Sequence, residues 1–443
     1  MKRLFVAIVL AALFLTSALS AQVGTGGDTV WTRAIGAVEQ VRFSPDGTTI
    51  YASYLYDSGK PAVALDAQTG EIIRQFPGMN AYRIDLSADG KYLAGCELIS
   101  DGAHYSVYEW NAQTGELVGT YGPEGAELKY FVINDVSYSP DGKYLGGIYY
   151  RNKEFDKNVF GFVIWDRATR KITYQKDADP AKRLLFSPDG KYLALCYEHG
   201  STGANYVELY KTDDWKLYAT LAGHTDAIED MSFSPDSKYL ATGGREGTLK
   251  VWDVNKKQIY WEVPKAQSVP EVHPSDRGVV QSVVFINSNY NISGGGGYAI
   301  PPKKILWHVP TKQLITTIFS WANKDMSTNA PAYVAAGNHW GVDLLDFSKY
   351  LGIKEKNNKK DSRILPNPTR GNTTLHFYPS SDGKYKISLF DSGMKEIKIL
   401  KEEFLQEAEQ LIEIDVEKLV VGTYFVQIKS EQGVEYVSFV VAR

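Results

Sequence analysis

Hydrophobic and polar residues alternate with a period of two along most of the chain. The alternation flanks recurring turns, as in Val41-Arg42-Phe43 before one turn and Tyr192-Leu193-Ala194 after another. This period is typical of β-strands with one buried face. The pattern therefore predicts an all-β protein built from hairpins.

The turns belong to an internal repeat with Ser-Pro-Asp-Gly at its centre. Proline presets φ for the first turn position, and glycine accepts the left-handed conformation that follows. Each copy therefore predicts a β-hairpin. Five copies and one degenerate copy begin at Phe43, Leu86, Tyr138, Phe186, Phe233 and Phe285.

A second marker follows each hairpin, a large hydrophobic residue that usually precedes Asp or Asn. The column reads Leu65, Trp110, Trp165, Tyr210, Trp252, Trp307 and Leu345. It covers 280 residues in six steps, about 47 per repeat. That period is close to the ~40–45 residues of a four-stranded propeller blade.

Phe-Ser-Pro-Asp-Gly hairpins followed by Val-Trp-Asp resemble the WD-repeat β-propeller family over residues 28–350. The best copy runs from Leu221 to Asp253 and includes His224, Thr242 and Trp252. The resemblance implies a hydrogen-bonded tetrad within a blade. Arg245 stands where the family has Asp, and the other copies lack the Gly-His pair. We therefore expect the tetrad to be incomplete and apolar packing between blades to matter more.

Six hairpins predict six blades. The segments 332–336 and 341–345 predict a seventh, and a spare strand at residues 29–33 would close the ring by pairing with an exposed edge. We predict a seven-bladed propeller closed by an N-terminal strand, with six or eight blades as the alternatives.

Residues 1–20 have the pattern of a secretory signal peptide. Lys2 and Arg3 precede an apolar run from Leu4 to Leu15, and small residues stand near the cleavage position. A transmembrane anchor is the alternative, but the run is shorter than the ~20 residues that a span needs. No other apolar stretch is long enough to cross a bilayer, so no transmembrane segment is expected in the mature chain.

The polar run at residues 351–363 predicts a linker, with a basic membrane-binding patch as the alternative. Residues 364–443 alternate in short strands and predict a small Ig-like β-sandwich. This region also resembles the C-terminal sorting domain of the type IX secretion system of Bacteroidetes-type bacteria. The resemblance rests on the Pro-Asn-Pro-x-x-Gly opening and the Gly-x-Tyr strand, which supply Pro366, Asn367, Pro368, Gly371, Gly422 and Tyr424.

That resemblance implies passage through the periplasm, export across the outer membrane by the type IX machinery, and then surface attachment or release. Ser438 stands where the family often has Lys in the last strand. An ordinary accessory sandwich is the alternative.

The composition and net charge of the chain limit the classes of partner that we expect. The 443 residues are 44% hydrophobic and 23% charged, as in a globular protein, and the net charge of −4 gives no electrostatic case for nucleic acid. Cys96 and Cys196 hold one repeat position two units apart. They would lie too far apart for a disulfide, so we expect two buried thiols.

Motifs with a known catalytic mechanism are absent from the sequence. It has no His-Glu-x-x-His, nucleophile elbow, phosphate loop or calcium loop, so no catalytic residue, cofactor or metal is predicted. The glycine-rich segment 293–298 predicts a turn, and His224 a structural role. Enzyme activity stays uncertain, because carboxylates from several blades can converge at a propeller axis.

Strand alternation puts the Ser-Pro-Asp-Gly hairpins and the turns after Trp-Asp on one face. The opposite face, here called the long-loop face, has irregular segments rich in aromatic and charged residues, where binding usually resides. The candidate binding residues on it are Tyr56, His104, Tyr105, Tyr149, Tyr150, Arg151, His199, Tyr206, Arg245 and Tyr298.

Three functions are compatible with these patterns. The first is a secreted or cell-surface scaffold that binds protein, peptide or glycan through the long-loop face. The second is an extracellular hydrolase or lyase with a site at the propeller axis. The third is an envelope assembly component whose partners are other surface proteins.

Overall fold

The computed structural model describes the chain from residue 29 to residue 441 with gaps. The described ranges are 29–55, 60–78, 80–96, 107–122, 131–152, 158–197, 205–266, 278–297, 300–319, 325–329, 333–337, 341–347, 351, 363–365, 372–377, 379, 382–391, 395–406, 410–430 and 433–441. The predicted signal peptide and most of the predicted linker lie outside them.

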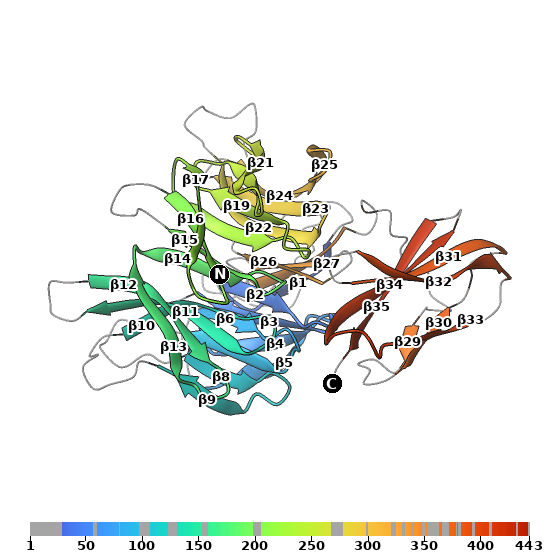
Figure 1. Ribbon diagram of the computed structural model, residues 1–443, viewed down its shortest axis with the longest axis horizontal. Coiled ribbons are helices and arrows are strands. Elements are labelled where there is room, and N and C mark those ends of the chain that lie inside the picture. Colours follow the sequence, from blue (N-terminus) through green and yellow to red (C-terminus); the bar gives the residue numbers. More distant parts are fainter. Residues whose placement is uncertain are drawn as a thin grey trace, which may run out of the picture.

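Seven four-stranded antiparallel sheets surround one axis, so the prediction of seven blades is confirmed (Figure 1). The first three blades contain, from the axis outward, β2 (Val38–Phe43), β3 (Thr49–Tyr54), β4 (Ala62–Asp66) and β5 (Ile72–Phe76); β6 (Arg83–Leu86), β7 (Tyr92–Cys96), β8 (Val107–Asn111) and β9 (Leu117–Tyr121); and β10 (Phe131–Tyr138), β11 (Tyr144–Asn152), β12 (Asn158–Asp166) and β13 (Ile172–Ala178).

The next three blades repeat this order. They contain β14 (Ala181–Phe186), β15 (Tyr192–Tyr197), β16 (Asn205–Lys211) and β17 (Leu217–His224); β18 (Ile228–Phe233), β19 (Tyr239–Gly244), β20 (Leu249–Asp253) and β21 (Gln258–Val263); and β22 (Val279–Asn287), β23 (Tyr290–Gly297), β24 (Ile300–His308) and β25 (Gln313–Phe319).

The N-terminal strand closes the ring, as predicted. The seventh blade contains β26 (Asp325–Asn329), β27 (Tyr333–Gly337) and β28 (Gly341–Asp346), and β1 (Thr29–Ala34) pairs with β28 as its outer strand. The Trp31 indole donates to Ala67 O at 3.0 Å, which also ties β1 to the first blade. Closure leaves no open edge between the two ends of the ring.

The Ser-Pro-Asp-Gly motif forms its hairpin through the serine hydroxyl. In the first copy, Ser44 Oγ donates to Asp46 Oδ1 at 2.6 Å and accepts from Thr49 N at 2.9 Å. Gly47 has φ 70°, in the left-handed region that glycine tolerates. The other copies keep both serine bonds, through Ser87, Ser139, Ser187 and Ser234.

The tetrad was predicted to be incomplete, but in blade five all four of its members are in contact. His224 Nε2 lies 2.7 Å from Thr242 Oγ1, which also accepts the Trp252 indole at 2.9 Å. His224 Nδ1 lies 2.5 Å from Glu246 Oε1. The carboxylate missing at Arg245 is therefore supplied by Glu246, one residue later in the same turn.

Both cysteines are buried and unpaired in the structure, as predicted. Burial raises the pKa of the Cys196 thiol to about 12, so the side chain stays protonated and packs as a small hydrophobe.

The C-terminal region is a two-sheet sandwich. One sheet contains β29 (Arg363–Leu365), β30 (Thr373–Phe377) and β33 (Gln410–Ile414), and the other contains β32 (Glu396–Leu405), β31 (Gly383–Phe390), β34 (Gly422–Ser430) and β35 (Gly433–Val441). Their inner faces form one core that includes Leu375, Ile387, Tyr424 and Phe439. Pro366, Asn367, Pro368 and Gly371 lie outside the described residues.

Candidate functional site

The long-loop face contains the connections from the second to the third strand of each blade and the crossings between blades. Five of the ten candidate residues lie outside the described residues: Tyr56, His104, Tyr105, His199 and Tyr298. The other five are placed by blades three, four and five.

Tyr149 lies inside blade three, although its neighbour Arg151 reaches the surface. Tyr149 faces Gly161 across the β11–β12 pair, where a Cβ atom would approach the tyrosine hydroxyl to 2.5 Å. The absence of a side chain at Gly161 thus makes room for the ring, which is fully buried. Tyr149 can therefore position the surface but not contact a ligand in this arrangement.

Asp177 joins Tyr149 to Arg151. The Tyr149 hydroxyl donates to Asp177 Oδ1, and Arg151 Nη2 donates to both carboxylate oxygens at 2.7 and 2.9 Å. Burial and this carboxylate raise the pKa of Tyr149 to about 12, so the hydroxyl keeps its proton. The Asp177 side chain is 57% exposed and that of Arg151 only 13%, so the pair presents mainly the carboxylate at the surface. Tyr150 packs its ring 5.2 Å from that of Phe160.

Tyr206 in blade four makes a similar contact. Its hydroxyl donates to Asp179 Oδ2 at 3.0 Å, and its ring lies 4.9 Å from that of Tyr197. Burial and the aspartate raise the pKa of Tyr206 to about 12. The ring is therefore held in one orientation at the edge of the face.

Arg245 in blade five belongs to a chain of three charges. Arg245 Nη2 lies 2.7 Å from Glu229 Oε1, and Lys182 Nζ donates to Glu229 Oε2 at 2.6 Å. Burial opposes ionisation of Glu229, but the two cations outweigh it and lower the pKa of the carboxyl group. Arg245 remains 45% exposed and is the member that a partner can reach.

One segment connects these three contacts, and we call residues 177–182 the blade 3–4 crossing. Asp177 pairs with blade three, Asp179 with blade four and Lys182 with blade five. No residue of this crossing was predicted to belong to the binding face. The feature that could have indicated it is the group of four charged residues in Lys176-Asp177-Ala178-Asp179-Pro180-Ala181-Lys182.

The axis has a different arrangement. Polar side chains on the inner strand of one blade accept hydrogen bonds from backbone N–H groups of the next inner strand, which have no strand partner on that side. The acceptors and donors are Gln40 and Ile84, Asp85 and Tyr138, Asp135 and Leu184, Asp230 and Val283, Ser232 and Phe285, Asp325 and Val41, and Ser327 and Phe43, at 2.7–3.2 Å.

Two arginines neutralise part of the negative charge of the aspartates along the axis. Arg42 lies 3.2 Å from Asp85 and 2.8 Å from Asp325. Arg183 lies 2.9 Å from Asp230 and 3.3 Å from Asp325. Burial outweighs the arginines at two carboxyl groups, raising the pKa of Asp230 to about 6 and that of Asp85 above its usual value.

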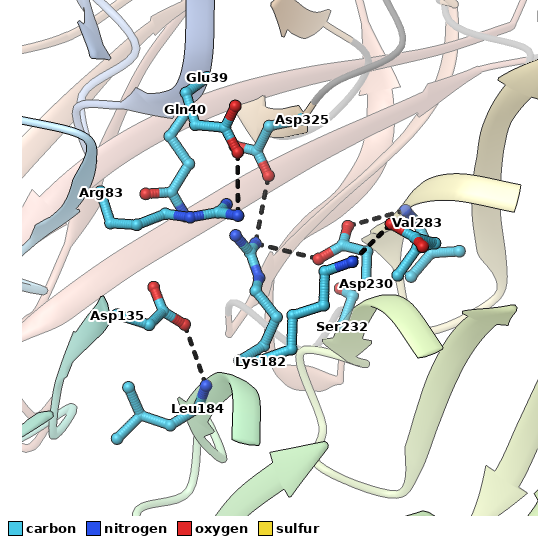
Figure 2. A network of polar contacts seen from close by, with 12 residues as sticks. Glu39, Gln40, Arg83, Asp135, Lys182, Leu184, Asp230, Ser232, Val283 and Asp325 are labelled. Atoms are coloured by element: carbon cyan, nitrogen blue, oxygen red, sulfur yellow. Dashed lines mark hydrogen bonds and ion pairs between the residues drawn. The ribbon is translucent and has the colours of Figure 1, made fainter. Parts of the chain in front are cut away.

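A second polar layer lies nearer the long-loop face, where Arg83 contacts Glu39 at 2.9 Å. Figure 2 shows this pair together with the bonds from Asp135 to Leu184 and from Asp230 to Val283. Among the described residues, no group of three or more His, Cys, Asp or Glu side chains could hold a metal ion.

Family models match two parts of the chain. A WD domain, G-beta repeat, covers residues 215–253, and a secretion system C-terminal sorting domain covers residues 363–442. The sorting domain indicates export, with the protein secreted or attached to the outer-membrane surface. Within the described ranges, no helix has the length and apolar character needed to span a membrane.

Two curated proteins are similar over short stretches. Protein HIRA of Dictyostelium discoideum is 39% identical over 80 residues, 17% of this chain. Target of rapamycin complex subunit wat1 of Schizosaccharomyces pombe is 32% identical over 107 residues, 23% of this chain. The matches span only 7% and 32% of those proteins.

A solved structure is similar over the propeller. The crystal structure of RRP9 WD40 repeats matches with a TM-score of 0.56 and 14% identity, covering 71% of this chain and 95% of that one. At this identity the likeness shows the fold alone. The molecule is therefore an all-β WD40-type propeller followed by a sorting-domain sandwich.

Proposed function

We propose that this exported propeller binds a protein or peptide partner through the long-loop face, centred on the blade 3–4 crossing. The support is that Asp177, Asp179 and Lys182 of this crossing form an array of polar contacts with blades three, four and five. Arg and Tyr are favoured at recognition hot spots, and groups already held in place lose little conformational entropy on binding.

The proposed route to that partner begins with the signal peptide and passage through the periplasm. The C-terminal sandwich then targets the chain to the type IX secretion machinery. Tyr424 supports this role structurally, since its hydroxyl donates to Val420 O at 2.9 Å and its ring packs against Phe439. A rigid sandwich would give the machinery a constant surface to recognise.

A glycan is the alternative ligand, and hydrolase or lyase activity at the axis is the alternative function. The axis offers little support for acid–base chemistry. Of its four aspartates, Asp85, Asp230 and Asp325 are ion-paired with arginine and also bond backbone N–H groups.

Partner capture tests the proposal. The mature full-length protein would be immobilised and incubated with envelope and medium fractions of its bacterium, beside the Arg245→Glu and Asp177→Lys variants. Each variant reverses an exposed charge of the array. We expect each to lower retention of a captured protein by at least about tenfold, the size of a moderate hot spot.

Lys216→Glu is the matched control, because Lys216 is 80% exposed on the opposite face. Tryptophan fluorescence would show that all four proteins fold. Equal retention by the parent and both array variants, or loss with Lys216→Glu alone, would rule out the long-loop face. Release of the partner by free glycans would favour the glycan alternative.

A further inference from the structure

The propeller axis contains a cavity that is separate from the proposed binding face. Its volume is about 260 Å³, and its lining includes the inner strands of all seven blades. The lining extends from the level of Asp135 and Asp230 to Phe186 and Pro188. Pro188 belongs to a Ser-Pro-Asp-Gly hairpin, so the cavity lies in the half of the axis nearest the hairpin face.

The cavity is negatively charged. Asp85, Asp135, Asp230 and Asp325 line it, against only two cations, Arg42 and Arg183. The two arginines ion-pair with Asp85, Asp230 and Asp325, but no ion pair within 4 Å includes Asp135 among the described residues. Arg183 nevertheless attracts Asp135 over a longer distance, and the four carboxylates outnumber the two guanidinium groups in the lining.

Blade three also supplies buried polar atoms with unused hydrogen-bonding capacity. Asp135 Oδ2 accepts from Leu184 N at 3.0 Å, and no described group donates to the other oxygen. Ser137 follows two residues later on the same strand and makes no hydrogen bond with the described part of the chain. Both residues are 2% exposed and line the cavity. Buried polar atoms in this state are normally satisfied by water or a ligand.

Two other blades line the same level of the cavity with apolar side chains. Leu185 in blade four and Val284 in blade six line the cavity at the inner-strand position that Ser137 holds in blade three. Met231 and Met326 add further apolar surface. The cavity therefore combines charged and hydrocarbon groups, and its volume equals that of about eight or nine water molecules in the liquid.

We propose that the axial cavity binds a small primary amine, with the ammonium group against Asp135 and Ser137 and a short hydrocarbon chain against Leu185 and Val284. An ammonium group has three donors and no acceptor, which matches a carboxylate oxygen and a hydroxyl oxygen. Its charge also reduces the net negative charge of the lining. This site would be independent of the long-loop face.

Ligand-observed NMR titration of the mature full-length protein tests this proposal. The probes are butylamine, the neutral isostere butanol and the anion butyrate, at millimolar concentration, equal ionic strength and about pH 8. At that pH the Asp230 carboxyl group, with a pKa of about 6, is ionised. We expect saturable binding of butylamine and none of butanol or butyrate.

Two variants locate the ammonium group. Asp135→Asn removes the charge but keeps an oxygen that can accept from Leu184 N, and should weaken butylamine binding by at least about tenfold. Ser137→Ala removes a neutral partner and should weaken it by about fivefold. Asp177→Asn is the matched control on the long-loop face and should leave the affinity unchanged.

Several outcomes would overturn the proposal. Butylamine that does not bind, or binds Asp135→Asn as tightly as the parent, would exclude an ammonium site at Asp135. Tighter binding of butyrate would show that Arg42 and Arg183 dominate the cavity. Binding of butanol with the same affinity as butylamine would show that the cavity recognises only the hydrocarbon chain. If Asp135→Asn did not fold, the three probes on the parent protein would still decide the charge preference.

Discussion

Blade five and the junction of blades two and three are braced by different chemistry. In blade five the Thr242 hydroxyl connects His224 to the Trp252 indole. At the junction the buried Glu109 carboxylate accepts from Tyr121 at 3.0 Å and from Tyr138 at 2.9 Å. It also accepts from Arg167 Nε at 2.7 Å.

The two arrangements meet the same need with different chemical groups. The first network joins His224, at the end of β17 in blade four, to Thr242 and Trp252 in blade five, so it also crosses between two sheets. The Glu109 network spans two sheets, because Glu109 and Tyr121 belong to blade two, whereas Tyr138 and Arg167 belong to blade three. Blade four has a related centre at Glu208, which accepts from Tyr197 and Tyr210. The WD-domain family model matches residues 215–253, which contain β17 of blade four and β18 to β20 of blade five.

Breaking the Glu109 network should have the largest effect. Glu109→Gln keeps the size of the side chain but leaves Arg167 without its buried counter-charge. We expect the free energy of unfolding to fall by about 3 kcal/mol, as for a broken buried ion pair. Urea unfolding followed by tryptophan fluorescence would measure it, since all nine tryptophans lie between Trp31 and Trp340.

Glu116→Gln is the matched control for Glu109→Gln, because Glu116 is exposed in the turn that follows β8. It should change the free energy of unfolding by less than about 0.5 kcal/mol. Equal effects of the two substitutions would mean that Glu109 contributes no more than a surface residue. Blade five would then be the stronger of the two braces.

The architecture was predictable from sequence because it depends on local chemistry. Each Ser-Pro-Asp-Gly hairpin requires only six adjacent residues, and the Trp-Asp column sets the period of the blades. Closure by residues 29–33 followed from counting strands. The same count placed Cys96 and Cys196 in separate blades.

The functional surface was less predictable because it depends on contacts distant in sequence. Tyr149 is buried because Gly161, twelve residues later, leaves space for its ring. The acceptors along the axis bond N–H groups 44 to 53 residues away in four pairs of adjacent blades, and 284 residues away across the closure of the ring. The carboxylate that contacts His224 belongs to Glu246, whereas the sequence pattern had directed attention to position 245. Such pairings between distant residues produce no periodic pattern in the sequence from which they could be predicted.

A smaller loss should follow from breaking the blade-five brace. Thr242→Val preserves shape and removes the hydroxyl shared by His224 and Trp252, which leaves two buried polar groups without this partner. We expect the free energy of unfolding to fall by about 2 kcal/mol. Thr220→Val, on the exposed side of β17, serves as the control in the same urea experiment. A loss larger than that of Glu109→Gln would reverse the order of the two braces.

The smallest effect should come from removing one of the side-chain-to-backbone hydrogen bonds along the axis. Every blade contributes a donor or an acceptor to these bonds. Ser327 Oγ accepts from Phe43 N at 2.9 Å across the closure of the ring, and Ser232 Oγ accepts from Phe285 N at 3.2 Å between blades five and six. Both serines line the cavity, where water can take over the bond. Ser327→Ala and Ser232→Ala should therefore each lower the free energy of unfolding by less than about 1 kcal/mol. If Ser327→Ala alone cost more than Thr242→Val, closure of the ring rather than bracing within the blades would limit the stability of the propeller.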